Sequence, residues 1–86
     1  MRHATEEDLD HIEPLLEELR KLPQLRERKR GSFSRGSRAF LHFHEDRGDF
    51  FVDAKLDTAF SRSRVTTTDE QTDFLSRVEA ALGSRA

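Results

Sequence analysis

The sequence predicts an α+β domain, in which an antiparallel meander of three or four strands carries an N-terminal and a C-terminal helix packed on one face. Two observations lead to this prediction. Near both ends of the chain, apolar residues recur at the three- and four-residue spacing of an amphipathic helix. Between them, apolar and polar residues alternate with the two-residue period of a half-buried strand. The 86 residues are expected to form one domain, residues 1–86.

Residues 5–22 are predicted to form the first helix. Its apolar stripe consists of Leu9, Ile12, Leu16 and Leu19, widened by Leu15 and Leu22. Thr5 is a suitable N-cap, and Asp8 follows at the spacing of a capping box. Because Pro14 has no N–H to donate, the helix is expected to kink or to begin there. Pro23 predicts that the helix ends just before it.

The segment that follows the helix is predicted to be mostly irregular. Residues 24–31 show no apolar period and are expected to be a connector. A short strand is predicted from Phe33 to Arg35, with a turn at Gly36-Ser37.

Residues 38–56 are predicted to form a β-hairpin with two different faces. One face is apolar and consists of Ala39, Leu41, Phe43, Phe50, Val52, Ala54 and Leu56. The other face carries Phe40, His42, His44, Asp49, Phe51, Asp53 and Lys55. Closing the hairpin over a four-residue loop, 45–48, places His44 opposite Asp49 and pairs apolar residues with each other. The helices are expected to cover the apolar face and to leave the histidine face open.

The C-terminal part of the chain is predicted to hold a third long strand and the last helix. Residues 60–67 alternate poorly and carry two arginines, which indicates an edge strand. Thr68 is expected to cap the helix, with Gln71 completing a capping box, and Gly83 to end it.

The composition excludes several classes of protein. The absence of cysteine rules out disulfides and thiolate metal sites, and it fits a reducing cytoplasm. No apolar run is long enough to span a bilayer, and the N-terminus lacks the apolar core of a signal peptide. Hydrophobic residues make up 34% of the chain and charged residues 37%. Such a lean core favours a partner, which could be a second copy of the chain.

The histidine face of the hairpin holds the most specific candidate chemistry. Two imidazoles at i and i+2 on a strand lie side by side, so His42 and His44 can share one metal ion. Asp49, placed opposite His44, would complete a two-histidine, one-carboxylate site for zinc. The alternative is a solvated cross-strand pair of His44 and Asp49 with no metal. No other cofactor is expected.

A local basic patch is a candidate nucleic-acid site. Residues 23–38 carry six basic residues against the single acid Glu27, which gives a net charge of +5 in a chain of net charge −2. The basic residues are Arg26, Arg28, Lys29, Arg30, Arg35 and Arg38. They could bind a phosphate backbone. The alternative is a solvated connector that balances the acidic first helix.

The sequence favours a small, non-enzymatic, cytoplasmic binding or interaction module. Phe40 and Phe51 are expected on the open face, where two exposed phenylalanines indicate self-association or a protein partner. No nucleophile elbow, phosphate-binding glycine loop or other catalytic motif is present, so an enzyme is not expected. Nucleic-acid binding is the first alternative and metal binding the second.

Two stretches resemble known bacterial proteins. The run LPQLRERKRGSFSRGSRAFLHFHED, residues 22–46, resembles the start of small MmcQ/YjbR-like domains. The segment RAFLHFHEDRGDFFVDAKL, residues 38–56, is similar to the hairpin of uncharacterised luciferase-domain-like bacterial proteins. The first resemblance implies an α+β fold near the frataxin-like architecture, and a double-winged mode of DNA binding that has been suggested for that family. Neither resemblance assigns a functional residue.

Overall fold

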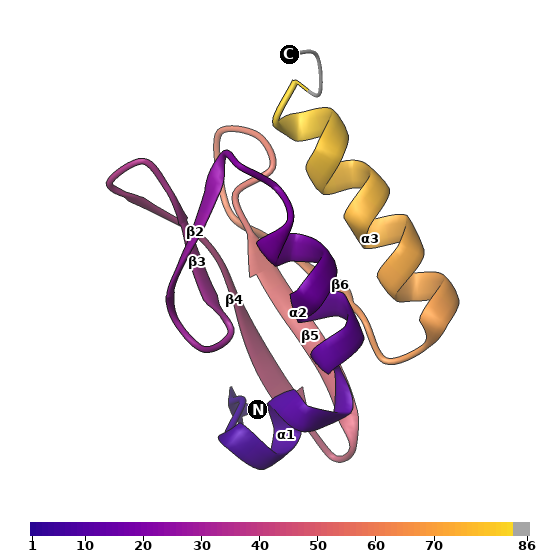
Figure 1. The fold of residues 1–86 in the computed structure, drawn as a ribbon. Helices are drawn as coiled ribbons and strands as arrows, with labels where there is room; N and C mark the ends of the chain where they lie inside the picture. The colour runs from indigo at the N-terminus through magenta and orange to yellow at the C-terminus, as the bar shows by residue number, and fades with distance from the viewer. Residues whose placement is uncertain (84–86) are drawn as a thin grey trace.

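A computed structural model describes residues 1–83 and shows one antiparallel sheet with helices on one of its faces (Figure 1). Within these residues the chain forms six strands and three helices. The strands are β1 Arg2–His3, β2 Leu25–Lys29, β3 Ser32–Arg35, β4 Arg38–Asp46, β5 Asp49–Ala54 and β6 Ser61–Arg64. The helices are α1 Glu6–His11, α2 Glu13–Arg20 and α3 Thr68–Ala81.

The sheet is a meander in which β2 to β6 lie in sequence order. The short strand β1 pairs with β4 at His44 and Glu45, on the same edge of β4 that β3 occupies at residues 38–42. The predicted α+β meander is therefore confirmed, with more strands than the three or four expected.

The first helical segment is divided into two helices at the place where proline predicts a defect. Thr5 caps α1: its hydroxyl accepts from the backbone N–H of Asp8, and the Asp8 carboxylate accepts from the Thr5 N–H. Ile12 has φ −117° and leaves the helical conformation. Pro14 then lies in the first turn of α2, where its missing N–H has no partner to lose.

The cap of α3 lies one residue earlier than predicted. Thr67, not Thr68, is the N-cap, and Glu70 rather than Gln71 closes the capping box. Three consecutive threonines made the pattern ambiguous, and the position of the glutamate decides it. The Gln71 amide donates instead to the carbonyl of Val65. Gly83 follows the helix with φ +74°, as predicted for its end.

The prediction that residues 24–31 form an irregular connector was wrong, because this segment contains β2. This strand is at the edge of the sheet and buries only Leu25, so it lacks the alternation that marks strands with one covered face. Its tip is tied to the helices: the Arg30 guanidinium lies 2.7 Å from Glu6 and Glu13 and 2.8 Å from Asp10.

The register of the central hairpin also differs from the prediction. The turn contains two residues, Arg47 and Gly48, with φ of +54° and +88°. Such paired left-handed conformations are typical of the tight turns that match strand twist. The pairing is therefore displaced by two residues, so that Asp46 faces Asp49 and Leu41 faces Ala54. A displacement of two keeps the side chains of the paired residues 41–46 and 49–54 on their predicted faces, which is why the apolar pattern did not reveal it.

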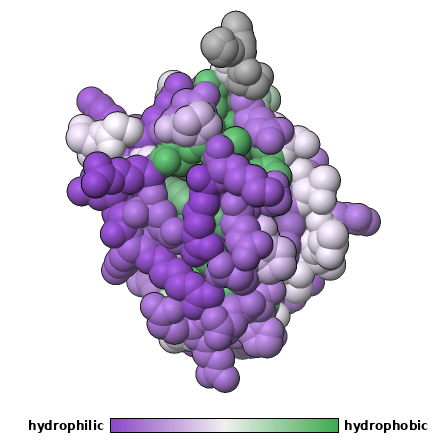
Figure 2. All heavy atoms as spheres, in the orientation of Figure 1, coloured by the Kyte–Doolittle hydropathy of each residue, from purple (hydrophilic) through white to green (hydrophobic). Residues whose placement is uncertain are grey.

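The core lies between the sheet and the helices. Its fully buried side chains include Ile12, Leu16, Leu19, Leu41, Val52, Val65, Phe74 and Val78. The outer side of the helices is mostly hydrophilic, and apolar side chains are visible mainly in one area near the upper end of the view (Figure 2). Within residues 1–83, no helix has the length and apolar character needed to cross a bilayer.

Replacing Gly31 by alanine is expected to destabilise the protein more than replacing Gly36. Both glycines have positive φ, +81° and +63°, so each alanine costs about 1–2 kcal/mol in backbone strain. A Cβ at Gly31 would also lie 2.8 Å from a methyl group of the buried Leu9, whereas none of the described atoms lies within 4 Å at Gly36. We expect about 1–3 kcal/mol of additional loss at Gly31 in urea unfolding. Equal losses would show that the β2–β3 tip does not pack on α1.

Candidate metal centre

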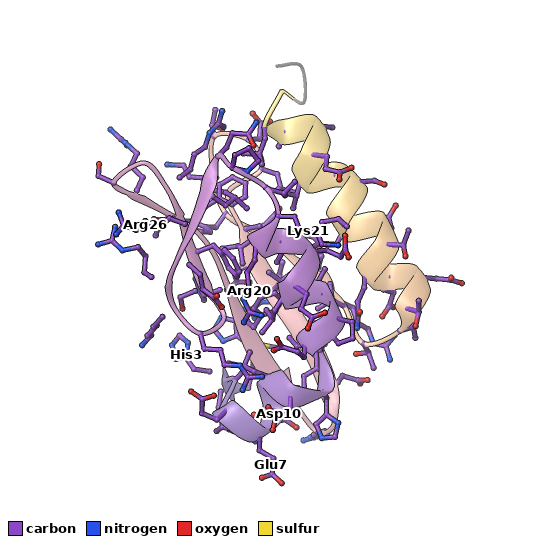
Figure 3. The ribbon with its side chains drawn as sticks, in the orientation of Figure 1. His3, Glu7, Asp10, Arg20, Lys21 and Arg26 are labelled. Carbon is purple, nitrogen blue, oxygen red and sulfur yellow. The ribbon has the colours of Figure 1, made fainter. Side chains whose placement is uncertain are left out.

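The face of the sheet turned away from the helices gathers three histidines, one carboxylate and an arginine. Residues directly opposite on neighbouring strands share a face. The pairs are His3 with His44, His42 with Asp53, and Asp53 with Arg62. His42 and His44 lie two residues apart on β4, so all five side chains project from one side. His3 belongs to the N-terminal strand β1 and is labelled in Figure 3.

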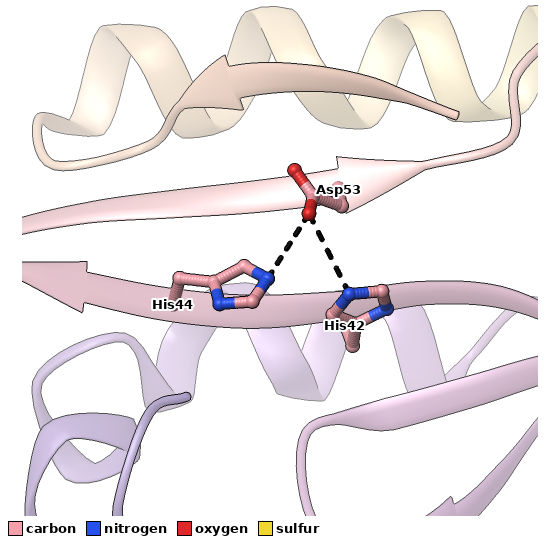
Figure 4. A group of neighbouring side chains, drawn as sticks. All are labelled: His42, His44 and Asp53. Atoms are coloured by element: carbon pink, nitrogen blue, oxygen red, sulfur yellow. Dashed lines mark hydrogen bonds and ion pairs between the residues drawn. The ribbon is translucent and has the colours of Figure 1, made fainter. Parts of the chain in front are cut away.

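The two β4 histidines converge on one carboxylate oxygen. His44 Nε2 lies 3.0 Å from Asp53 Oδ2, and His42 Nε2 lies 3.5 Å from the same atom (Figure 4). One ligand atom from each of the three residues lies within 4.8 Å of the others. His44 is only 9% exposed, whereas His42 and Asp53 are partly open. The group is thus accessible from one side.

Arg62 on β6 orients the carboxylate. Its Nε donates to Asp53 Oδ1 at 2.7 Å and its Nη2 donates to Oδ2 at 2.8 Å, a two-bond fork. These hydrogen bonds lower the pKa of the Asp53 carboxyl, and the Arg62 charge adds to the effect. The carboxylate is therefore ionised at neutral pH.

The surroundings of His42 favour its neutral form. Burial lowers the pKa of the His42 imidazole, and so does the positive charge that His44 can carry, while the Asp53 charge acts in the opposite direction. His3 packs against both rings, with centroid distances of 4.8 Å to His44 and 5.8 Å to His42. The ring of Phe60 approaches His42 from the side of β6, at 5.9 Å. A neutral imidazole is the form that can bind a metal.

The predicted pairing of Asp49 with His44 was wrong. Asp49 does not face His44, because the two-residue turn places it opposite Asp46. Instead it pairs with Arg64 at 2.8 Å, next to the hydroxyl of Thr66. The sequence did hold a signal for Asp53: a two-residue turn ending in glycine at 47–48 would have placed Asp53 opposite His42. His3 had no such signal, since β1 has only two residues.

The predicted basic patch is divided by the fold. Arg30 is bound to three acids of the first two helices. The other members have no ion pair with any residue of the described part of the chain; they are Arg26, Arg28, Lys29, Arg35 and Arg38. All five are exposed on β2, β3 and the start of β4. Arg26 lies well away from the helices in Figure 3.

The pair of exposed phenylalanines predicted on the open face is not formed. Phe40 is 3% exposed and belongs to the core. The strand bulges there: Ala39 faces Ser34 and Leu41 faces Phe33, so Phe40 has no partner on β3 and turns towards the helices. Phe51 does lie on the open face, opposite Arg64, and is half-buried.

The convergence of two imidazoles and a carboxylate suits a divalent transition metal. Zinc takes nitrogen and oxygen ligands at about 2.0–2.2 Å, so two ligands of a tetrahedral zinc lie roughly 3.3–3.5 Å apart. The separations of 3.0 and 3.5 Å at Asp53 Oδ2 bracket that range. Three protein ligands leave a fourth position for water or another ligand.

Comparison with known proteins found no relative of this chain. The chain matches no family model, and no match was found among the curated proteins or the solved structures. The resemblance to MmcQ/YjbR-like domains stays a prediction. The function is therefore inferred from the geometry of the site.

Asp53→Asn is expected to lower the pKa of His42 further, because the substitution removes a negative charge that favours the imidazolium. Asp49→Asn, the matched control, should leave that pKa unchanged, since Asp49 pairs with Arg64 instead. An NMR titration of the ring protons in metal-free protein measures both. A change in the Asp49 variant as large as that in the Asp53 variant would contradict the register, in which Asp53 alone faces His42.

Proposed function

We propose that this protein binds a divalent transition-metal ion through His42, His44 and Asp53. The observation that carries the proposal is the approach of two Nε2 atoms to one carboxylate oxygen, at 3.0 and 3.5 Å. The residues come from two paired strands within the sheet. Sites built on such elements hold their ligands more firmly than sites on loops.

The second layer of contacts supports the same proposal. A ligating carboxylate is usually held by a further hydrogen bond, and the Arg62 Nε bond to Asp53 Oδ1 supplies one without using Oδ2. The Arg62 Nη2 contact with Oδ2 would compete with the ion and has to lengthen when the ion binds. His42 is the most exposed of the three and can rotate to close the set.

Metal binding is preferred to the two alternatives for a structural reason. The predicted self-association surface requires Phe40 and Phe51 to be exposed together, but Phe40 is buried. The predicted nucleic-acid site requires the whole basic patch, but the Arg30 guanidinium is already paired with carboxylates of the helices. The histidine cluster, by contrast, includes the carboxylate of Asp53 in place of the predicted Asp49, which pairs with Arg64. With three protein ligands, the site is of the open type that binds a fourth, exchangeable ligand.

Zinc is expected to bind the purified protein at one site and to stabilise it. A concentration of about 100 times the Kd would raise the free energy of unfolding by about 2.7 kcal/mol. His44→Ala and Asp53→Ala should each weaken zinc binding at least about tenfold, since each removes a direct ligand. Titration calorimetry measures the affinity, and the visible spectrum of the cobalt form reports the coordination number.

The matched controls are His11→Ala and Asp49→Ala. His11 stacks on Phe50 at 5.9 Å and lies outside the cluster, and Asp49 is bound to Arg64. Both variants should bind zinc as the unmodified protein does. Equal zinc affinity in the His44→Ala protein would refute the proposal and leave the cluster as a hydrogen-bonded group on the sheet.

A further inference from the structure

A cavity of about 700 Å³ lies beside the histidine cluster, where the sheet is interrupted. Strands β1 and β3 share one edge of β4 but do not meet, and Phe43 lies between their pairing regions. There the Ala4 N–H donates to the Phe43 carbonyl at 3.1 Å. Figure 1 shows the tip of the β2–β3 hairpin close to the N-terminal strand, on the border of this gap. The volume is typical of a pocket for a small molecule.

The walls of the cavity are positively charged. Its lining includes Arg28, Lys29 and Arg30 together with His3 and His42, and no aspartate or glutamate of the described chain contributes to it. The full chain contains 17 acidic residues, so their absence from this lining is a local property. Arg30 is neutralised by the helix carboxylates, whereas Arg28 and Lys29 are exposed and pair with no residue among 1–83.

The cavity also has an apolar wall and an unused hydroxyl group. Its apolar lining residues are Leu9, Phe33, Leu41 and Phe43, each at most 4% exposed. Ser34, which also lines the cavity, is 4% exposed, and its Oγ has no hydrogen-bond partner among the described residues. Buried hydroxyl groups are almost always paired, because an unpaired one loses its hydration without compensation. An oxygen of a bound ligand would supply the missing partner.

We propose that this cavity binds a small organic anion, with a phosphate or carboxylate group held by Arg28, Lys29 and Ser34. Two exposed cations and a hydroxyl donor match the oxygens of such a group. The site does not depend on the metal, because His42 is the only one of the three proposed ligands that lines it.

Phenyl phosphate and phenylacetate are the probes, with benzylamine as a cation of similar shape. In resin-treated, metal-free protein, at least one of the two anions should bind and shift the amide signals of Gly31, Ser32 and Ser34, while benzylamine should not. The tighter of the two anions identifies the head group. Equal binding of benzylamine would show that the cavity selects only apolar surface, and failure of both anions would also refute the proposal.

The variant Arg28→Ala/Lys29→Ala should bind the preferred anion at least about tenfold more weakly. Its matched control is Arg35→Ala/Arg38→Ala, which removes the same charge from exposed, unpaired neighbours outside the cavity. The control should retain its affinity. An equal loss in both variants would mean that binding reflects the general surface charge, and it would overturn the site.

The variant Ser34→Ala tests whether the Ser34 hydroxyl binds the ligand or only contributes to stability. It should weaken anion binding about fivefold, while the thermal midpoint should stay the same or rise, because a buried unpaired hydroxyl is removed. A lower midpoint with unchanged affinity would contradict the assignment. His44→Ala, which removes a metal ligand outside the cavity, should keep anion binding, so the two proposals can fail separately.

Discussion

The arrangement of the open face depends on a two-residue turn. Arg47 and Gly48 both adopt left-handed backbone conformations, and the Glu45 carboxylate accepts from the Gly48 N–H at 2.8 Å. Because the turn is this short, Asp46 faces Asp49 and every further pair of β4 and β5 follows from that one. The turn thereby brings His42 opposite Asp53, although it lies several residues away from both.

Ion pairs complete a fold whose core is small. Arg30 joins the tip of β2–β3 to Glu6 and Glu13, and Arg20 joins α2 to Glu27 on β2 at 2.6 Å. Individual exposed pairs contribute little, but a network that spans several elements fixes how they meet. The same network neutralises part of the basic segment. Counting charges along the chain therefore overstates the cations that are free to bind a partner.

The two faces of the sheet carry different kinds of side chain. The helix face holds the apolar core, and the open face holds the imidazoles and Asp53. Burial of His44 and the Arg62 Nε bond to Asp53 Oδ1 hold two of the proposed ligands in place without an ion, which would reduce the cost of ordering them on binding. The cavity meets this cluster at His42. An anion held by Arg28 and Lys29 would therefore lie near the open coordination position, although each site is defined by its own residues.

The sequence by itself determined the fold class, the capping box at Thr5, the helix break before Pro14 and the faces of the paired hairpin residues 41–46 and 49–54, because these depend on local spacing and on a period of two. Tertiary structure alone decided the partner of each histidine, since a displacement of two residues leaves the apolar pattern unchanged. It also decided the burial of Phe40, through a bulge against β3. It decided the strand at residues 25–29 as well, because an edge strand with mostly charged side chains has no apolar alternation to predict it. His3 joins the cluster only because β1 pairs with a strand 41 residues further along the chain, a contact with no local pattern to predict it.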